Sequence, residues 1–263
     1  MIRREVFTAV FLLIATASRA GAQIAPPASS ADEPHAQTAS VSATESPMPS
    51  WWSIFGDLPH DLRHMPDRTN LVWLGGAGAA SLAMHRFDAA ITQDVFTADD
   101  LDLPFEAGSP LGSGWVEIGG ALGAFVGGKL IGRPWVAQVG SDLVRAQLIS
   151  GITTRGIKVA VGRRRPDGGA QSFPSGHTSA AFASATVLER HFGWRIGAPA
   201  YAAAMYVATA RLQENHHYPS DVIFGAAIGI VAGRSVTVGH EKHRFTLAPV
   251  AVPRGIGIEV MRR

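Results

Sequence analysis

Apolar and small residues dominate the chain between Asn70 and Arg234. The stretch shows no strand-like alternation of apolar and polar positions, and Gly- or Pro-containing breaks divide it. This pattern predicts an all-α fold, a compact bundle of about six helices. The expected helices are residues 70–86, 115–131, 135–162, 177–192, 196–212 and 219–237.

The uncharged runs within these helices are short for a membrane protein. Thr69–Met84, Ile196–Ala210 and Val222–Gly233 contain 16, 15 and 12 residues, whereas a spanning helix needs about 18 or more. Their Gly and Ala content allows close helix packing. We therefore expect a compact bundle with a membrane surface as a partner, and an integral, multi-spanning protein is the alternative.

The N-terminus has the layout of a secretory signal peptide, expected to comprise residues 1–22. Arg3 and Arg4 precede an apolar run, Val6–Ala17, and small residues follow in an A-x-A-type arrangement. Export to the periplasm is expected, with an uncleaved anchor helix as the alternative. Residues 23–50 are rich in Ala, Ser, Pro and Thr, which predicts a disordered linker.

The C-terminal tail, residues 239–263, differs in character from the bundle. Phe245–Val252 and Gly255–Val260 are β-prone and flank a Pro-Arg-Gly turn. A short terminal β-hairpin is therefore expected. The tail carries no candidate chemistry.

Composition narrows the chemistry. The chain has 263 residues, of which 46% are hydrophobic and 17% charged, enough for one sizeable core plus tails. The formal net charge is +2 and no long basic tract occurs, so nucleic-acid binding is not indicated. There is no cysteine, which excludes disulfides, thiolate catalysis and zinc–thiolate sites.

Three polar patches stand out in the apolar background. In the first, Lys158 and Arg165 are seven residues apart, two helical turns, so both can face one side. Two fixed cations suit an anion with several oxygens. Pro166 then begins a turn. A basic run at a helix end is, by itself, more often a solvated cap.

The second patch is the Pro-Ser-Gly-His segment that ends at His177. Pro and Gly beside Ser175 favour a bend that opens a helix, and the free N–H groups of a helix N-terminus can hold an oxyanion. His177 would lie at the mouth of such a site. A structural helix start is the alternative interpretation of this patch.

The third patch contains Arg211, His217, Pro219 and Asp221. Pro219 suits the first turn of a helix, so His217 would lie just before that helix and Asp221 inside its first turn. An aspartate at this spacing can hold one imidazole nitrogen and leave the other free to attack. A capped helix with surface histidines is the alternative.

Together the patches resemble the phosphatidic acid phosphatase type 2 / vanadium haloperoxidase superfamily. All intervals and the order match its pattern of K-x6-R-P, P-S-G-H and R-x5-H-x3-D. The matching residues are Lys158, Arg165, Pro166, Pro174, Ser175, Gly176, His177, Arg211, His217 and Asp221. The resemblance is densest over 140–235, within an expected catalytic domain of residues 51–238.

The resemblance implies how a phosphoryl group would be held. Lys158, Arg165 and Arg211 would contact its oxygens, and Ser175 with the N–H of Gly176 would complete the site. Three cations can stabilise the charge that Mg²⁺ stabilises elsewhere. We therefore expect no metal and no cofactor.

It also implies a mechanism. His217 would attack phosphorus and form a phosphohistidine, while Asp221 fixes its tautomer. His177 would protonate the leaving oxygen and then activate water. The family serine before the arginine is Ala210 here, and the interval from Pro166 to Pro174 is short. We expect Ala210 to adjust the activity rather than to abolish it. We expect the short interval to form a compact loop over the site.

Several interpretations of the function remain distinct. The expected enzyme is an exported phosphatase whose substrate, a phosphomonoester or pyrophosphate, is a phosphorylated lipid. A soluble, broad-specificity acid phosphatase acting on small phosphoesters is the closest alternative. A vanadium haloperoxidase and a non-catalytic phosphate-binding module are the others, and the paired histidines argue against the module.

Two further features invite a functional interpretation. His216 adjoins the expected nucleophile, but the motif spacing selects His217. Asp142 and Arg145 lie one turn apart on the helix that carries Lys158. We expect them to form a structural pair, with support of the site as the alternative.

Overall fold

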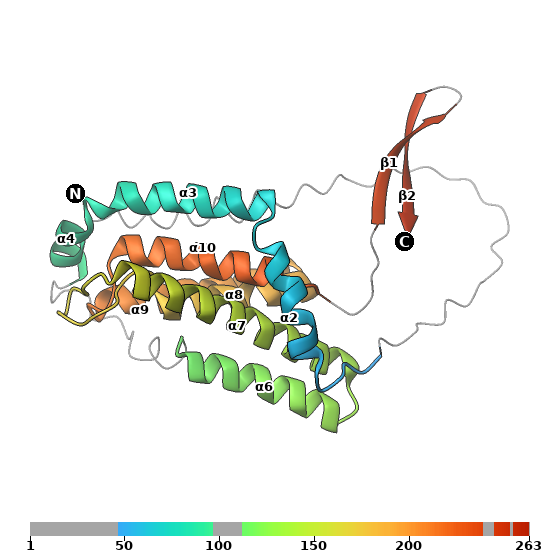
Figure 1. Ribbon diagram of the computed structural model, residues 1–263, viewed down its shortest axis with the longest axis horizontal. Helices are drawn as coiled ribbons and strands as arrows, with labels where there is room; N and C mark the ends of the chain where they lie inside the picture. Colours follow the sequence, from blue (N-terminus) through green and yellow to red (C-terminus); the bar gives the residue numbers. More distant parts are fainter. Residues whose placement is uncertain (1–46, 97–111, 239–244, 253–254, 263) are drawn as a thin grey trace. The chain divides into compact units, whose positions relative to one another are not determined.

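The computed structural model describes residues 47–96, 112–238, 245–252 and 255–262, with side chains for 47–94 and 112–238 (Figure 1). The expected signal peptide and nearly all of the expected linker therefore lie outside the described residues.

The predicted all-α bundle is confirmed. Each of the six expected helices is present, and its bounds differ from the expected ones by at most two residues. They are α3 (Arg68–His85), α6 (Gly114–Leu130), α7 (Pro134–Val161), α8 (Gly176–Phe192), α9 (Trp194–Gln213) and α10 (Pro219–Ser235). Pro134 and Pro219 start their helices, and Gly162, at φ 62°, ends α7 in the left-handed conformation.

Three elements were not predicted: α2 (Ser53–His64), α4 (Asp88–Ile91) and the π-helix η1 (Thr92–Phe96). Pro59 lies inside α2, which obscures the helix in the sequence. Tertiary contacts stabilise α2, because it packs on α7 and buries Ile54 and Asp61.

Helices α7, α8 and α10 form the centre of the bundle (Figure 1). Helix α8 packs against α7, α9 and α10, while α3 covers α10 and α6 covers α7. Small and β-branched side chains fill the central contact, including Ala146, Ile149, Val187 and Ala232. Three of the helices that carry motif residues, α7, α8 and α10, are thus held together by one core.

Helices α8 and α10 approach each other backbone to backbone along a row of glycines at every fourth position. A Cβ atom at Gly225 would lie 2.6 Å from the Ser175 oxygen, and one at Gly229 would lie 2.3 Å from the Ser179 oxygen. One at Gly233 would lie 2.6 Å from Thr186 Cβ. Only glycine fits at such distances, so the row fixes the spacing of α8 and α10.

A buried ion network ties α2, α7 and α8 together. The Arg145 side chain is 1% exposed and donates to Asp61 on α2 and to Asp142 on its own helix. His191 Nε2 of α8 lies 2.8 Å from Asp142 Oδ2. This arrangement fits the structural interpretation of the Asp142–Arg145 pair.

The expected C-terminal hairpin is confirmed in the backbone. Strand β1 (Phe245–Val252) pairs antiparallel with β2 (Gly255–Arg262), from Phe245 opposite Arg262 to Val252 opposite Gly255.

None of the described helices combines the length and the apolar character that crossing a bilayer requires. Their exterior nevertheless carries large apolar side chains. Trp52, Trp115 and Trp194 are 76%, 88% and 71% exposed, respectively.

Candidate active site

His217 lies buried in the segment before α10, with only 2% of its surface exposed. Its backbone N–H donates to the Arg211 carbonyl over 3.3 Å. Its Nδ1 faces Asp221 Oδ2 at 3.6 Å, an ion-pair distance longer than a hydrogen bond. Asp221 thus lies on the Nδ1 side of the ring, which leaves Nε2 as the nitrogen available to a substrate.

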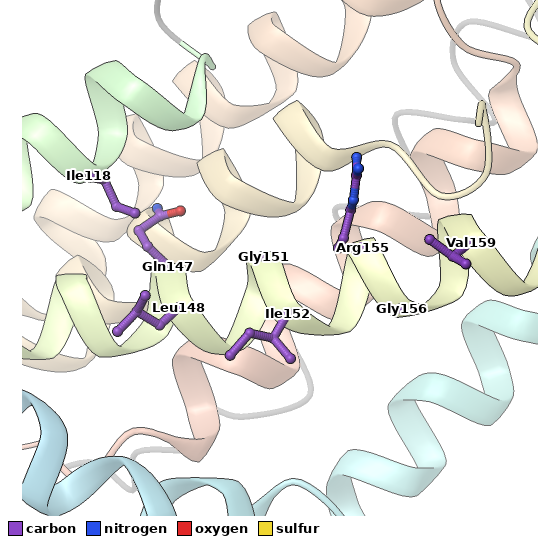
Figure 2. A pocket seen from close by; sticks show the side chains of 8 residues that line it. All are labelled: Ile118, Gln147, Leu148, Gly151, Ile152, Arg155, Gly156 and Val159. Atoms are coloured by element: carbon purple, nitrogen blue, oxygen red, sulfur yellow. The ribbon is translucent and has the colours of Figure 1, made fainter. Parts of the chain in front are cut away.

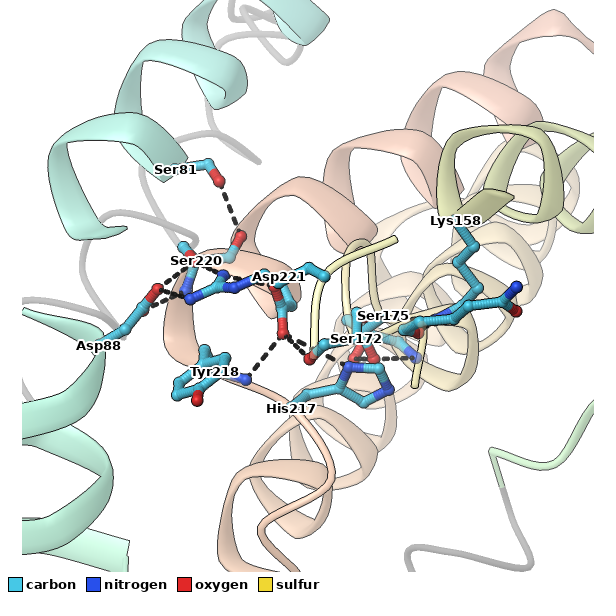
Figure 3. A network of polar contacts seen from close by, with 12 residues as sticks. Ser81, Asp88, Lys158, Ser172, Ser175, His217, Tyr218, Ser220 and Asp221 are labelled. Atoms are coloured by element: carbon cyan, nitrogen blue, oxygen red, sulfur yellow. Dashed lines mark hydrogen bonds and ion pairs between the residues drawn. The ribbon is translucent and has the colours of Figure 1, made fainter. Parts of the chain in front are cut away.

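Asp221 accepts several hydrogen bonds that fix its carboxylate (Figure 3). Oδ2 accepts from the Ser172 hydroxyl and, at 2.9 Å, from the backbone N–H of Tyr218. Oδ1 accepts from Arg163 over 2.7 Å. Burial raises the pKa of Asp221, but the contacts from His217, Ser172, Tyr218 and Arg163 outweigh it and hold the pKa below the ordinary value. The carboxylate is therefore ionised at neutral pH.

The N-terminus of α8 lies against Asp221 and Lys158. Ser175 caps the helix, and its N–H donates to the Asp221 carbonyl over 3.0 Å. The Ser175 hydroxyl contacts Thr178 Oγ1 at 2.9 Å and is fully buried, so it serves the helix cap in this structure. A Cβ on Gly176 would lie 3.8 Å from Lys158 Cε, which places the lysine stem beside this helix start.

Lys158 is partly buried at the C-terminal end of α7. Its ammonium group donates to the carbonyls of Gln171 and Ser172, the latter at 3.2 Å, and an ammonium has three donors. Burial and the nearby Arg165 lower its pKa to about 8, although Asp221 opposes the shift. Lys158 is therefore mainly cationic at pH 7 and retains a donor for an anion.

Two arginines supply further positive charge. Arg165 Nε and Arg211 Nε are both buried and have no hydrogen-bond partner among the described residues. Burial, and then the charge of Arg165, lower the pKa of Arg211 to about 10. Glu214 pairs with Arg211, a contact that the sequence motifs did not reveal. Buried donors of this kind suit a bound oxyanion.

His177 extends the site from the first turn of α8. Its pKa is lowered to about 4, first by burial and then by the charges of Arg211, His217, His216 and Arg165. His177 is therefore neutral at pH 7 in the free protein, and it lies within electrostatic reach of the other site residues. The structure brings together all eight residues expected at the site: Lys158, Arg165, Ser175, Gly176, His177, Arg211, His217 and Asp221.

His216 points to a different set of partners. Its Nδ1 lies 3.0 Å from Glu214 Oε2, and its Nε2 lies 3.7 Å from Asp167 Oδ2. It is partly exposed, unlike the buried His217. His216 is thus engaged at the rim of the site.

Sequence patterns did not reveal three residues that hold Asp221 directly or through a neighbour: Ser172, Asp88 and Arg163. Ser172 donates to it directly, and Arg163 joins it to the buried Asp88 of α4. Arg163 belongs to the basic run that ends at Arg165, but nothing in the run distinguishes it from Arg164. Asp88 lies in a segment without any motif that would mark it.

A largely apolar groove of about 660 Å³ lies along α7 (Figure 2). Ile118 of α6 and Leu148, Ile152 and Val159 of α7 line it. Gln147 and Arg155 are its polar lining residues, and Arg155 lies one helical turn before Lys158. Arg155 reaches the Gln171 side chain, and Gln171 also accepts from Lys158.

The described residues contain no cluster of metal ligands. Across 47–96 and 112–238, no three His, Cys, Asp or Glu side chains gather as a metal site would require.

Comparisons with known proteins agree with the motifs. Residues 140–245 match the family model described as the PAP2 superfamily. The chain is 39% identical over 105 residues to a lipid A 1-phosphatase of Porphyromonas gingivalis, covering 38% of this chain and 23% of that protein. It is 31% identical over 111 residues to a lipid A 1-phosphatase of Rhizobium etli, covering 36% of this chain and 47% of that protein.

The matched segment thus spans less than half the length of these curated relatives. Among solved structures, the fold is similar to a transmembrane PAP2 type phosphatidylglycerolphosphate phosphatase from Bacillus subtilis, with a TM-score of 0.50 and 20% identity. That match covers 64% of this chain and 92% of the other. The family resemblance of the motifs is confirmed, because residues 140–245, which contain all three motifs, match the PAP2 superfamily model.

Proposed function

We propose that this protein is a metal-independent phosphohydrolase that removes phosphate from a phosphorylated lipid through a phosphohistidine on His217. One observation carries the proposal: two histidines, an aspartate and three cations converge at the N-terminus of α8. Binding of an anion would need only the cations. The buried His217–Asp221 pair is the arrangement that nucleophilic catalysis requires.

In the first step, Nε2 of His217 forms a bond to phosphorus as the bond from phosphorus to the leaving oxygen breaks. His177 is protonated in the complex, because the bound phosphate offsets the surrounding positive charges, and it gives its proton to that oxygen. Asp221 compensates the positive charge on the ring of His217. In the second step, His177 takes a proton from water, which attacks phosphorus and releases phosphate from His217. Lys158, Arg165 and Arg211 stabilise the phosphoryl oxygens in both steps.

Three observations support a lipid as the substrate. The relatives from Porphyromonas gingivalis and Rhizobium etli are lipid A 1-phosphatases. A largely apolar groove lies along α7, the helix that carries Lys158, and several tryptophans, among them Trp115 and Trp194, are exposed. We include in the proposal that the protein is exported to the periplasm and works at a membrane surface. Hydrolysis of small soluble phosphoesters is the competing outcome.

A substrate panel tests this assignment. Phosphate release should be faster from phosphatidic acid, a polyprenyl pyrophosphate or lipid A in detergent than from a small aryl phosphate. Ile152→Glu in the groove should lower kcat/KM for the preferred lipid about tenfold, the cost of roughly one lost apolar contact. It should leave the aryl phosphate unaffected, because that substrate does not reach the groove.

Val72→Glu is the matched control, since Val72 is 74% exposed on α3 and lies outside the groove. Equal losses in both variants would count against the groove. Better hydrolysis of the aryl phosphate by the unmodified protein would instead favour a scavenging phosphatase.

Chelation tests the metal-independent step. The protein should keep full activity in EDTA, because the proposed charge stabilisation comes from Lys158, Arg165 and Arg211. Phosphate release is measured before and after dialysis against EDTA. A loss of activity that Mg²⁺ or Zn²⁺ restores would refute the proposal on this point.

A further inference from the structure

Arg163 lies between two buried carboxylates, although it is not among the residues of the sequence motifs. One of its terminal nitrogens donates to Asp221 Oδ1 and to Ser220 Oγ, both at 2.7 Å. The other donates to Asp88 Oδ2 at 2.7 Å. The guanidinium also covers the ring of Tyr218, 4.1 Å from its centroid. Both terminal nitrogens of Arg163 are thus engaged with residues around Asp221.

Asp88 is the anchor of this arrangement (Figure 3). Its side chain is 3% exposed, and its Oδ1 accepts the backbone N–H of Ser220 over 3.0 Å. Its Oδ2 accepts from the Ser220 hydroxyl and from Arg163. Asp88 therefore holds both Arg163 and the first turn of α10, the turn that carries Asp221.

Helix α3 supports the same turn, because the Ser81 hydroxyl donates to the Ser220 carbonyl over 2.9 Å. Both Ser81 and Asp88 lie outside the region that matches the family model, residues 140–245. The first turn of α10 is therefore fixed partly by a segment that precedes the motifs by many residues.

We propose that Arg163, anchored by Asp88, is a positioning residue that fixes the orientation of Asp221 toward His217. The inference rests on the proposed function, in which Asp221 acts through His217. Arg163 holds Oδ1, which leaves Oδ2 directed at the imidazole, where Ser172 and the Tyr218 N–H also hold it. Without Arg163 the carboxylate would lose a fixed cation and one of its restraints, and Asp88 would lose its charged partner.

Asp221 is surrounded by charged and titratable groups from several elements. They are Lys158 of α7, Arg163 and Arg165 after α7, His177 of α8, Arg211 of α9, His217 before α10 and, through Arg163, Asp88 of α4. Among the described residues, Arg163 forms the direct ion pair with Asp221, and the imidazole of His217 lies beside the carboxylate at 3.6 Å. Removal of Arg163 should therefore raise the pKa of Asp221 more than the removal of an exposed arginine.

The test uses the full chain with Arg163→Gln, Arg163→Lys and the neighbouring Arg164→Gln, since Arg164 is exposed. Arg163→Gln should lower kcat by about 10²-fold, as misplacement of a catalytic group does, with KM little changed. The acid limb of the pH–kcat profile should move up by about one pH unit, because an adjacent cation lowers a carboxyl pKa by one unit or more. Arg163→Lys should restore the limb, since it keeps the charge, but only part of kcat. Arg164→Gln should match the unmodified protein.

Asp88→Asn completes a double-mutant cycle. If the two residues act as a unit, the double variant Asp88→Asn/Arg163→Gln should lose no more activity than Arg163→Gln alone. Losses that simply multiply would overturn the role of Asp88 as the anchor. Thermal unfolding of each variant separates these effects from loss of the fold.

The outcomes distinguish this inference from the proposed function. If Arg163→Gln is folded and keeps its kcat and pH profile while His217→Ala is inactive, the positioning role is wrong and the function stands. If the unmodified protein hydrolyses no phosphate, the proposed function fails. The positioning role is then decided by ¹³C NMR titration of Asp221, assigned with Asp221→Asn. An unchanged Asp221 pKa in Arg163→Gln overturns the role, and a raised pKa supports it.

Discussion

Replacement of His217 by alanine should lower turnover by at least about 10³-fold, the scale seen when a nucleophile is removed. The side chain is buried, lies 3.6 Å from Asp221 and is surrounded by the cations that would hold a phosphoryl group. No described neighbour can replace it, because His216 pairs with Glu214 and Asp167 at the rim. The measurement is single-turnover and steady-state phosphate release from the best substrate of the panel.

His216→Ala is the matched control, since it removes an adjacent imidazole from the same segment. It should change kcat only slightly. After an alkaline quench, phosphorylation that is stable in alkali and lost in acid should appear on the unmodified protein and be absent from His217→Ala. Retained turnover in His217→Ala, or equal losses in the two variants, would sink the assignment of the nucleophile.

Replacement of His177 by asparagine should cost about 10²- to 10⁴-fold in turnover of a lipid phosphate, the usual contribution of a general acid–base group. The first-step loss should be much smaller for an aryl phosphate, because a good leaving group needs little protonation. The second step still needs His177 to activate water. The variant should therefore accumulate phosphohistidine with the aryl substrate, seen as a burst of aryl alcohol.

The pKa of His177 gives this prediction a direct test. In the free protein the pKa is lowered to about 4 by burial and by Arg211, His217, His216 and Arg165. A bound oxyanion offsets those positive charges, so the pKa should rise and the acid form should be populated at higher pH in the complex. NMR titration of the His177 ring with and without vanadate measures this. A pKa that stays near 4 in the complex would contradict the role of His177 as the acid.

Local sequence pattern predicted the bundle well because helix length, Gly/Pro breaks and motif intervals are local properties. The six long helices and the hairpin follow from such signals. Helix α2 does not, since Pro59 within it argues against a helix in the sequence. Its packing depends on the contact of Asp61 with Arg145, two residues 84 apart. Patterns within a window cannot encode such a contact.

The candidate site also combines contacts that local sequence spacing predicts with contacts that it does not. His217 lies just before α10 and Asp221 lies in its first turn, so their spacing alone predicts that they meet. Arg163 and Asp88 are 75 residues apart and meet only because α4 is placed against the start of α10. Even the predicted Ser175 had an unexpected feature, since its hydroxyl is used to cap α8. The motifs thus predicted which residues come together, while the partner that each of these residues contacts depends on the tertiary structure.

The glycine row between α8 and α10 has a consequence for motion during turnover. Backbone packed on backbone leaves no side chains that could yield, and tightly packed interfaces resist continuous deformation. His177 and Asp221 belong to this helix pair, so they move as one rigid body. Substrate and phosphate must therefore enter and leave without a change in the distance between His177 and Asp221, the proposed acid and the aspartate that orients the nucleophile.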